Sequence, residues 1–306
     1  MNEEKSKAQG SVQTTGHAWD GDLQEFNNPL PNWWLWGFYA TVVFAVIYWV
    51  LFPAFPVGKT YTKGVMNNIT YKNADGIENT THWNTRSLLM KDLQDAREMQ
   101  KPYIDKISKA SYTQIAKDKD QSAFAYSTAK VLFADNCAAC HQAGGAGVVG
   151  LYPNLADDAW LWGGSYQNIE ATIRNGRKGA MPGFKGNLSA EQIDNVAEYV
   201  LSFSGLKVNA DKAAKGKAVF EGGGGCFACH TKEGTGQIAM GAANLTDKVW
   251  TIADVNGAKT LAAKKAVVKA VVNKGVGREM PAWQGRLSDA DIKMLTYYVH
   301  QLGGGK

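Results

Sequence analysis

All four cysteines of this 306-residue chain fall in two copies of one five-residue motif, C-x-x-C-H. The copies run from Cys137 to His141 and from Cys226 to His230. No cysteine remains for a structural disulfide, so the cysteine usage predicts a cofactor site. In such a motif the two thiols add to the vinyl groups of a haem, and the adjacent His ligates the iron. One helical turn can place both sulfurs under one edge of the porphyrin.

Both motifs lie inside an internal repeat, which makes a chance match of the motif negligible. The matching segments are KVLF at 130–133 with KAVF at 217–220, NLADDAW at 154–160 with NLTDKVW at 244–250, MPGF at 181–184 with MPAW at 280–283, and LSAEQI at 188–193 with LSDADI at 287–292. The last pair predicts the start of a final helix in each copy, with Ser as the N-cap. Equivalent aromatic residues are expected to line the haem pockets, namely Trp160, Trp250, Tyr199 and Tyr298.

Each copy also offers a methionine in a short turn ahead of a proline, Met181 in the first and Met280 in the second. An electron carrier needs a sixth iron ligand, and a Met thioether stabilises the reduced iron. Met240 is the competing candidate in the second copy, but its counterpart in the first copy is Gly150. Ligation within each copy is the simplest arrangement, and exchange of the Met-bearing loops between copies stays open.

The predicted sites therefore use eight residues in two kinds of role. The predicted haem attachments are Cys137, Cys140, Cys226 and Cys229, and the predicted iron ligands are His141, Met181, His230 and Met280. A tetrahedral zinc site built from the four cysteines is the alternative, disfavoured because each pair carries its own His and Met. With both axial positions filled, neither iron has an open position for substrate, which favours electron transfer over catalysis.

An uncharged stretch between Glu25 and Lys59 predicts one membrane span. Its apolar part, residues 33–55, is long enough, because about 20 apolar residues cross a bilayer. Tryptophans cluster at its start and one lies near its end, as in an aromatic belt. Thirty-two residues precede the apolar part, so we expect an uncleaved anchor rather than a signal peptide.

The orientation of the span rests on the haem motifs rather than on charge. Lys5 and Lys7 precede the span at a distance, whereas Lys59, Lys63 and Lys72 follow it closely. This count alone would place the large C-terminal part in the cytoplasm. Haem attachment to C-x-x-C-H takes place outside the bacterial inner membrane, so we expect the opposite orientation, with periplasmic haem domains.

The predicted fold class is mostly α, with one N-terminal transmembrane helix followed by two tandem cytochrome c-like domains. The expected parts are a cytoplasmic tail (1–32), a transmembrane helix (33–57), a periplasmic linker with an amphipathic helix (58–125), a first cytochrome c domain (126–205) and a second one (206–306). Helical spacing of apolar residues predicts the linker helix over residues 86–100, ended by Pro102.

The net charge of +5 is too weak to indicate nucleic-acid binding, but the charge is unevenly distributed. Residues 126–205 carry a net charge of −2 and residues 206–306 one of +7. The second copy contains about nine additional residues between Trp250 and Gly275, rich in lysine. Either the two regions dock different partners, or these are unrelated solvated faces.

Taken along its length, the chain closely resembles the dihaem subunit (subunit III) of cbb3-type cytochrome c oxidases. The resemblance rests on HAWDG at 17–21, NPLPNWW at 28–34, GLYPNL at 150–155 and WLWGG at 160–164, beside the two haem motifs. It implies two covalently attached haem c groups, and ligation by the residues named above.

The resemblance also implies partners. The chain would accept electrons from a cytochrome c donor and pass them to a monohaem cytochrome c subunit and the haem–copper catalytic subunit. Oxygen reduction and proton pumping would belong to that catalytic subunit, so this chain would itself be non-catalytic. Two other functions stay open, a freestanding membrane-anchored dihaem shuttle and the cytochrome subunit of a periplasmic dehydrogenase.

Overall fold

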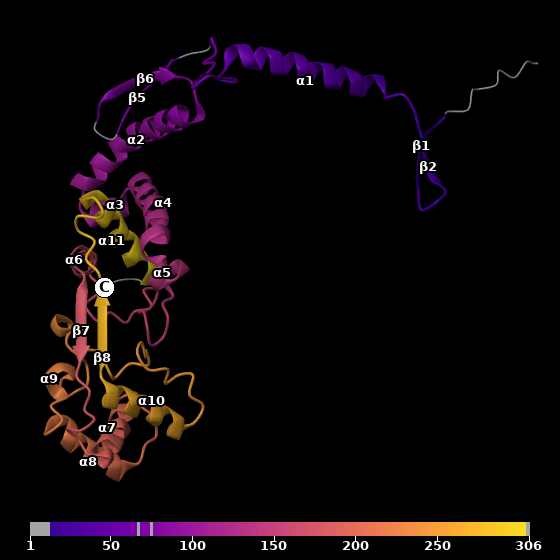
Figure 1. The fold of residues 1–306 in the computed structure, drawn as a ribbon. Helices are drawn as coiled ribbons and strands as arrows, with labels where there is room; N and C mark the ends of the chain where they lie inside the picture. Colours follow the sequence, from indigo (N-terminus) through magenta and orange to yellow (C-terminus); the bar gives the residue numbers. More distant parts are fainter. Residues whose placement is uncertain (1–12, 66–67, 74–75, 304–306) are drawn as a thin grey trace, which may run out of the picture. The chain divides into compact units, whose positions relative to one another are not determined.

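The computed structural model describes residues 13–65, 68–73 and 76–303 (Figure 1). Residues 1–12 of the expected tail, with Lys5 and Lys7, lie outside these ranges. The chain divides into two compact units, residues 1–99 and residues 100–306. The fold is mostly helical, as the sequence predicts, and each unit is described by itself.

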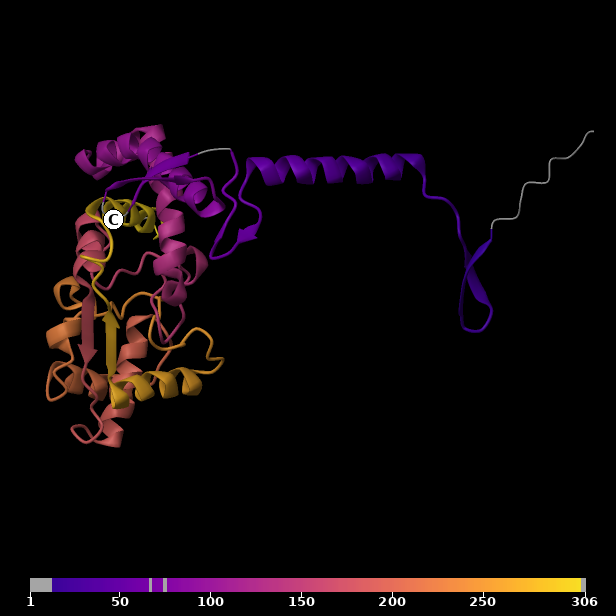
Figure 2. The same cartoon turned by 45° about the horizontal axis from the view of Figure 1, so that its top comes forward.

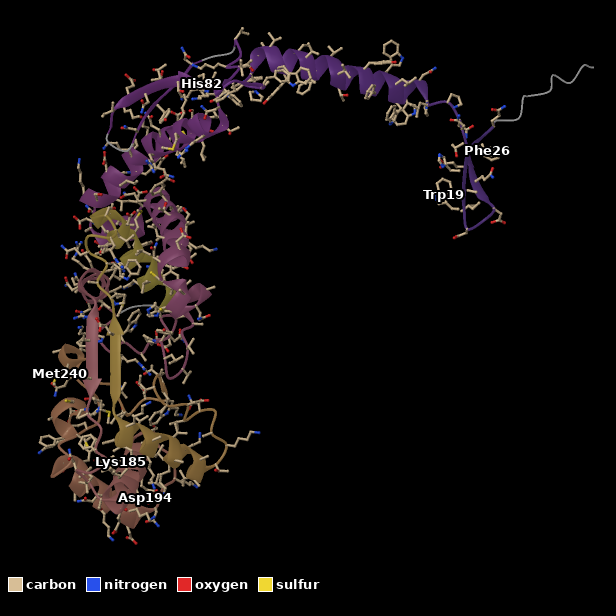
Figure 3. All side chains as sticks on the ribbon, viewed as in Figure 1. Trp19, Phe26, His82, Lys185, Asp194 and Met240 are labelled. Atoms are coloured by element: carbon tan, nitrogen blue, oxygen red, sulfur yellow. The ribbon has the colours of Figure 1, made fainter. Side chains whose placement is uncertain are left out.

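The first unit begins with a hairpin and a long apolar helix. Strands β1 (Thr14–Trp19) and β2 (Leu23–Phe26) pair antiparallel, and Trp19 and Phe26 are labelled on them in Figure 3. Helix α1 (Asn32–Leu51) has 20 residues, a mean hydropathy of 1.8 and no buried side chain. At 1.5 Å per residue it is about 30 Å long, the thickness of a bilayer core.

Helix α1 ends at Leu51, six residues before the expected boundary. Pro53 explains the early end, because the residue before a proline disfavours helical backbone and Phe52 is extended. Two further hairpins follow, formed by β3 (Pro56–Val57) with β4 (Thr60–Tyr61) and by β5 (Asn68–Lys72) with β6 (Glu78–His82).

The linker helix is longer than expected. Helix α2 (Thr85–Lys109) continues through Pro102, so the prediction that this proline ends the helix is wrong. Tertiary packing outweighs the lost backbone hydrogen bond. Beyond the proline, Ile107 is fully buried and the ring of Tyr103 stacks on that of Phe124 at 5.1 Å.

The second unit contains both haem motifs, each in a short helix that follows a longer one. In chain order its elements are α3 (Tyr112–Lys117), α4 (Lys119–Asn136), α5 (Ala138–His141), η1 (Ala143–Gly145), α6 (Tyr166–Asn175), β7 (Arg177–Met181), α7 (Ala190–Phe203), α8 (Ala210–Glu221), α9 (Phe227–His230), η2 (Ile238–Met240), α10 (Leu261–Lys274), β8 (Val276–Met280) and α11 (Asp289–Gly303). The predicted Ser N-caps are confirmed, since Ser189 and Ser288 each accept a hydrogen bond from a backbone N–H of the first turn at 3.1 Å.

This unit has two apolar cores, and each combines helices from both sequence repeats. The first apolar core joins α4 and α6 of the first repeat with α11 of the second. The second apolar core joins α8 and α10 of the second repeat with α7 of the first. Ring contacts follow the same exchange, with Tyr298 against Phe133 and Tyr199 against Phe220, both at 5.4 Å between ring centroids. Figures 1 and 2 show α11 beside α4, and α7 beside α8 and α10.

A short connection accounts for this exchange of the final helices. Only residues 204–209 separate α7 from α8, so the two helices pack against each other rather than apart. Helix α7 therefore joins the core that begins with α8. The equivalent place on α4 is then filled by α11, which carries the matching apolar pattern.

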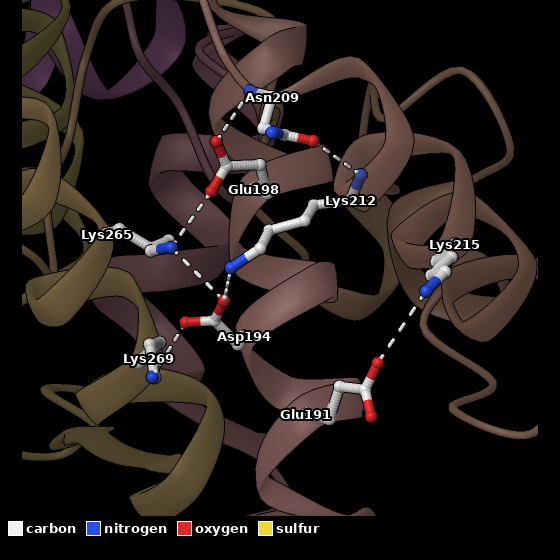
Figure 4. Close-up of polar contacts among 8 residues, drawn as sticks. All are labelled: Glu191, Asp194, Glu198, Asn209, Lys212, Lys215, Lys265 and Lys269. Carbon is white, nitrogen blue, oxygen red and sulfur yellow. Dashed lines mark hydrogen bonds and ion pairs between the residues drawn. The ribbon is translucent and has the colours of Figure 1, made fainter.

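The exchanged helix α7 is also tied down by charge (Figure 4). The Asp194 carboxylate pairs with Lys212 of α8 at 2.9 Å, and with Lys265 and Lys269 of α10 at 3.2 and 2.9 Å. Lys265 also pairs with Glu198, whose other oxygen accepts the backbone N–H of Asn209. Part of the lysine excess in the second repeat is therefore used in ion pairs within the chain.

Candidate haem sites

Each C-x-x-C-H motif forms one turn of helix, which follows α4 directly in the first copy and follows α8 after Gly222–Gly225 in the second. In the first, the His141 backbone N–H donates to the Cys137 carbonyl at 2.9 Å. In the second, His230 donates to Cys226 at the same distance. Residues four apart lie on one face of a helix, so the first cysteine and the histidine of each motif are neighbours. This is the arrangement that thioether attachment and iron ligation by one motif require.

Both motif histidines are held in one tautomer. The His141 Nδ1 lies 3.1 Å from the Pro153 carbonyl oxygen, and the His230 Nδ1 lies 2.9 Å from that of Ala243. A carbonyl oxygen only accepts, so each Nδ1 carries the proton and each Nε2 keeps a free lone pair. Burial lowers the pKa of both imidazoles, which favours the neutral form that a metal ligand needs.

The first cysteine of each motif is partly buried in the core beside it. Cys137 packs against the first apolar core and Cys226 against the second. Burial raises the pKa of the Cys137 thiol to about 11 and also raises that of Cys226. The four cysteines do not gather into one cluster, and no group of three or more His, Cys, Asp or Glu residues suited to a metal ion occurs among the described residues. Nothing in this geometry favours the zinc alternative.

Each of the two methionines packs against the apolar core that adjoins the motif of the other repeat. Met280 packs against the first apolar core, which also receives Cys137. Met181 packs against the second, which receives Cys226. Met240 ends η2, is 52% exposed and belongs to neither core (Figure 3).

A two-stranded ladder links the two methionines. Strands β7 and β8 pair antiparallel over five residue pairs, and Figure 1 shows them side by side. Met280 lies opposite Arg177, the first residue of β7, and Met181 lies opposite Val276, the first residue of β8. The ladder thus holds one methionine at each of its ends.

One buried polar group remains without a partner at the first site. The Trp160 indole Nε1–H is buried, and no described residue accepts a hydrogen bond from it. Trp160 packs against the first apolar core together with Cys137 and Met280. A buried N–H without an acceptor is costly in a protein interior. A haem propionate is an acceptor of the required chemistry, so the residues present fit this cofactor.

Two of the remaining histidines are bonded or stacked locally. His82 (Figure 3) lies 2.6 Å from the Tyr61 hydroxyl, and the His300 ring stacks on Tyr166 at 3.8 Å between centroids. Sequence reasoning did not identify the carbonyl groups of Pro153 and Ala243. Their position just before the matching Asn-Leu segments of the two repeats was the available signal.

Comparisons with known proteins identify the family of the chain. Residues 124–200 and 211–299 match the family model described as cytochrome c oxidase, cbb3-type, subunit III. Residues 11–59 match the N-terminal domain of cytochrome oxidase-cbb3, FixP. The fold and the sites define a membrane-anchored c-type cytochrome, a protein that binds haem c.

Curated relatives match along nearly the whole chain. A cbb3-type cytochrome c oxidase subunit FixP from Azorhizobium caulinodans is 41% identical, over 97% of this chain and 95% of that protein. Subunits CcoP from Azospirillum brasilense and Cereibacter sphaeroides are 39% and 37% identical, over 100% and 97% of both chains. This chain belongs to the family of subunit III of cbb3-type cytochrome c oxidases.

Proposed function

We propose that this chain carries electrons through two covalently attached haem c groups, from a cytochrome c donor toward the oxygen-reducing subunit of a cbb3-type cytochrome c oxidase. Family membership makes it an electron-transfer subunit of that complex. The proposed number of two haems rests on the pair of equivalent C-x-x-C-H turns. In each turn the histidine is held in one tautomer, and a methionine packs against the same core as the turn's first cysteine.

The proposed ligand sets cross between the repeats. Cys137 and Cys140 attach the first haem, with His141 and Met280 as its iron ligands. The second haem is attached by Cys226 and Cys229, and its iron ligands are His230 and Met181. The packing of each methionine against the core of the other repeat's motif supports this assignment over ligation within one repeat.

Haem c supplies a one-electron iron couple, and the protein's task is to bind, enclose and orient it. A His and Met pair fills both axial positions and favours the reduced iron, which suits electron transfer rather than oxygen chemistry. The Trp160 N–H would hold a propionate of the first haem. Oxygen reduction is proposed for the haem–copper subunit, with a monohaem cytochrome c subunit as a further electron-transfer partner.

Helix α1 anchors the chain in the membrane, and its orientation is part of the proposal. We place residues 58–306 in the periplasm, because haem attachment to C-x-x-C-H takes place on that side of the bacterial inner membrane. Alkaline phosphatase, which is active only outside the cytoplasm, reports this orientation when fused after Gly303. Activity of that fusion, and none of a fusion after Asn27, is the expected result, whereas the reverse pattern would overturn the orientation.

The function is tested by purifying the full chain in mild detergent from its native membrane. Intact-mass measurement should give the polypeptide plus two haem groups, and the spectrum should show c-type haem. Co-elution with a subunit that contains b-type haem, together with oxygen uptake driven by reduced cytochrome c, is the expected outcome. A chain that elutes alone would favour a freestanding membrane-anchored shuttle. Co-elution with a dehydrogenase would favour the cytochrome subunit of a periplasmic dehydrogenase.

A further inference from the structure

Two glycines occupy matching places just before the paired strands. Gly176 caps the C-terminal end of α6 with φ 69° and ψ −177°, and Gly275 caps α10 with φ 72° and ψ −176°. This combination of angles is essentially restricted to glycine. Conformation alone would explain a glycine at each place, but the surroundings of both residues add a second constraint.

Each glycine lies directly against the backbone of the Met-Pro turn of the other repeat. A Cβ atom on Gly176 would lie 2.8 Å from the Ala282 nitrogen and 2.9 Å from the Pro281 carbonyl carbon, and would also strike the Met280 carbonyl oxygen. The clash is with backbone, which no side-chain rotation can relieve. Gly176 and the Met280 turn can therefore approach only because position 176 has no side chain.

The second glycine repeats this contact. A Cβ atom on Gly275 would lie 2.5 Å from the Gly183 nitrogen and 2.7 Å from the Pro182 carbonyl carbon, and would strike the Met181 carbonyl oxygen. Two independent positions in the repeat thus show the same approach of a glycine helix cap to a Met-Pro turn.

Backbone hydrogen bonds fasten both turns to the same helix ends. After Met280, the N–H groups of Trp283 and Gln284 donate to the carbonyls of the last residues of α6, Ile173 and Arg174, both at 3.1 Å. The turn after Met181 is bound to α10 in the same way, by Phe184 N–H to Val272 at 2.9 Å and Lys185 N–H to Asn273 at 3.3 Å. Each glycine therefore lies next to the hydrogen bonds that join the Met-Pro turn to the helix end.

We propose that Gly176 and Gly275 are positioning residues for the methionine ligand of the other repeat, Gly176 for Met280 and Gly275 for Met181. The inference rests on the proposed crossed ligation. Any side chain at position 176 lifts the Met280 turn off the end of α6 and draws its sulfur away from the first haem. The same argument connects position 275 with the second haem. Each repeat therefore positions the methionine ligand that the other repeat contributes.

The strands themselves supply matched control positions. Gly179 is the third residue of β7 and Gly277 the second residue of β8, and neither has a positive φ. A Cβ atom on Gly277 meets nothing within 4 Å, and one on Gly179 only reaches Trp162 at 4.0 Å. Alanine at these positions adds the same atom within the strands that follow Gly176 and Gly275, without touching either Met-Pro turn.

The test compares four alanine variants with two ligand variants, each in the purified full-length haem-loaded chain. The readouts are the Met-to-iron charge-transfer band of the ferric spectrum and the midpoint potential of each haem. Met280→His shifts the potential of one haem and so identifies it. We expect Gly176→Ala to weaken the Met band and lower the potential of that same haem, with the other haem unchanged. Gly275→Ala should act on the haem that Met181→His identifies, and Gly179→Ala and Gly277→Ala should leave both haems as in the wild type.

Three outcomes overturn the inference, and one concerns the proposed function. A normal Met band in Gly176→Ala would overturn the positioning role. So would a change in the Met band or midpoint potential that is as large in the control Gly277→Ala as in Gly275→Ala. If Met280→His and Met181→His change neither haem, the ligand assignment itself fails. Should Gly176→Ala yield no holoprotein, Gln284→Pro takes its place, since it removes the N–H that binds Arg174 and leaves Gly176 unchanged. An unchanged Met band in that variant would also overturn the inference.

Discussion

Lys269 of α10 lies 2.9 Å from the carboxylate of Asp194 in α7, and the two residues come from different sequence repeats. Lys265 and Lys212 reach the same carboxylate from α10 and α8. The Asp194 side chain is 19% exposed, so water replaces little of this interaction when it is lost. This ion network joins the exchanged helix α7 to α8 and α10, and it leads to a first prediction.

Replacing Asp194 with Asn should destabilise the protein, because three lysine ammonium groups lose their shared partner. The expected cost is about 2 kcal/mol in the free energy of unfolding, the usual range for a hydrogen bond to a charged group. Urea denaturation of the full chain at neutral pH measures it. Glu191→Gln is the control, since the Glu191 pair with Lys215 is 3.8 Å apart and mostly exposed (Figure 4). Equal stability of the two variants would contradict the prediction.

The same carboxylate should make stability depend on acid. The hydrogen bond from Lys269, with those from Lys212 and Lys265, holds the pKa of Asp194 well below its usual range. A lowered folded-state pKa gives stability that is complete above the unfolded pKa of about 3.9 and is lost as the pH falls toward the folded value. We therefore expect Asp194→Asn to flatten the loss of stability as the pH falls below about 4. Parallel curves for the wild type and the variant would show that this network has no role in it.

The sequence was sufficient for features that depend on local pattern. The span follows from an uncharged run, the repeats from matched segments, and the Ser189 and Ser288 caps from their neighbours in sequence. Motif chemistry likewise named the candidate cysteines and histidines, because attachment and ligation use residues close together in the chain.

The exchange of final helices could not be read in this way. Tyr199 and Tyr298 occupy equivalent places in helices with the same apolar pattern, so either helix can fill either core. What decides between the arrangements is the short connection at residues 204–209, a property of chain length rather than of side-chain pattern. Pro102 was misread for a related reason, because the burial of Ile107 outweighs a local helix-ending signal.

The exchange makes a direct prediction about the iron ligands. In a chain with Cys137→Ala and Cys140→Ala, only the second haem should remain attached. Met280→His in that background should leave the ferric spectrum unchanged, whereas Met181→His should remove its Met-to-iron band. The reciprocal background, with Cys226→Ala and Cys229→Ala, is the control and should show the opposite dependence. Loss of the band on changing Met280 in the first background would instead assign each methionine to the haem of its own repeat.

The buried indole of Trp160 leads to the last prediction. A donor N–H aimed at a haem propionate stabilises the ionised carboxylate and so lowers its pKa. Trp160→Phe keeps most of the ring in the core but removes the N–H, so the propionate should titrate at higher pH. The midpoint potential of the first haem, measured across pH, should then begin its pH dependence at a higher pH than in the wild type.

The second repeat provides the control for this measurement. Trp250 is the equivalent residue, but its indole is not among the buried groups without a partner in the described part of the chain. We expect Trp250→Phe to leave the pH dependence of both haems nearly unchanged. Resonance Raman spectra of the propionate bending modes give a second readout that does not depend on electron transfer. A Trp160→Phe protein with wild-type Raman modes and a wild-type pH profile would mean that the indole N–H does not serve the haem, and that its partner must be sought elsewhere.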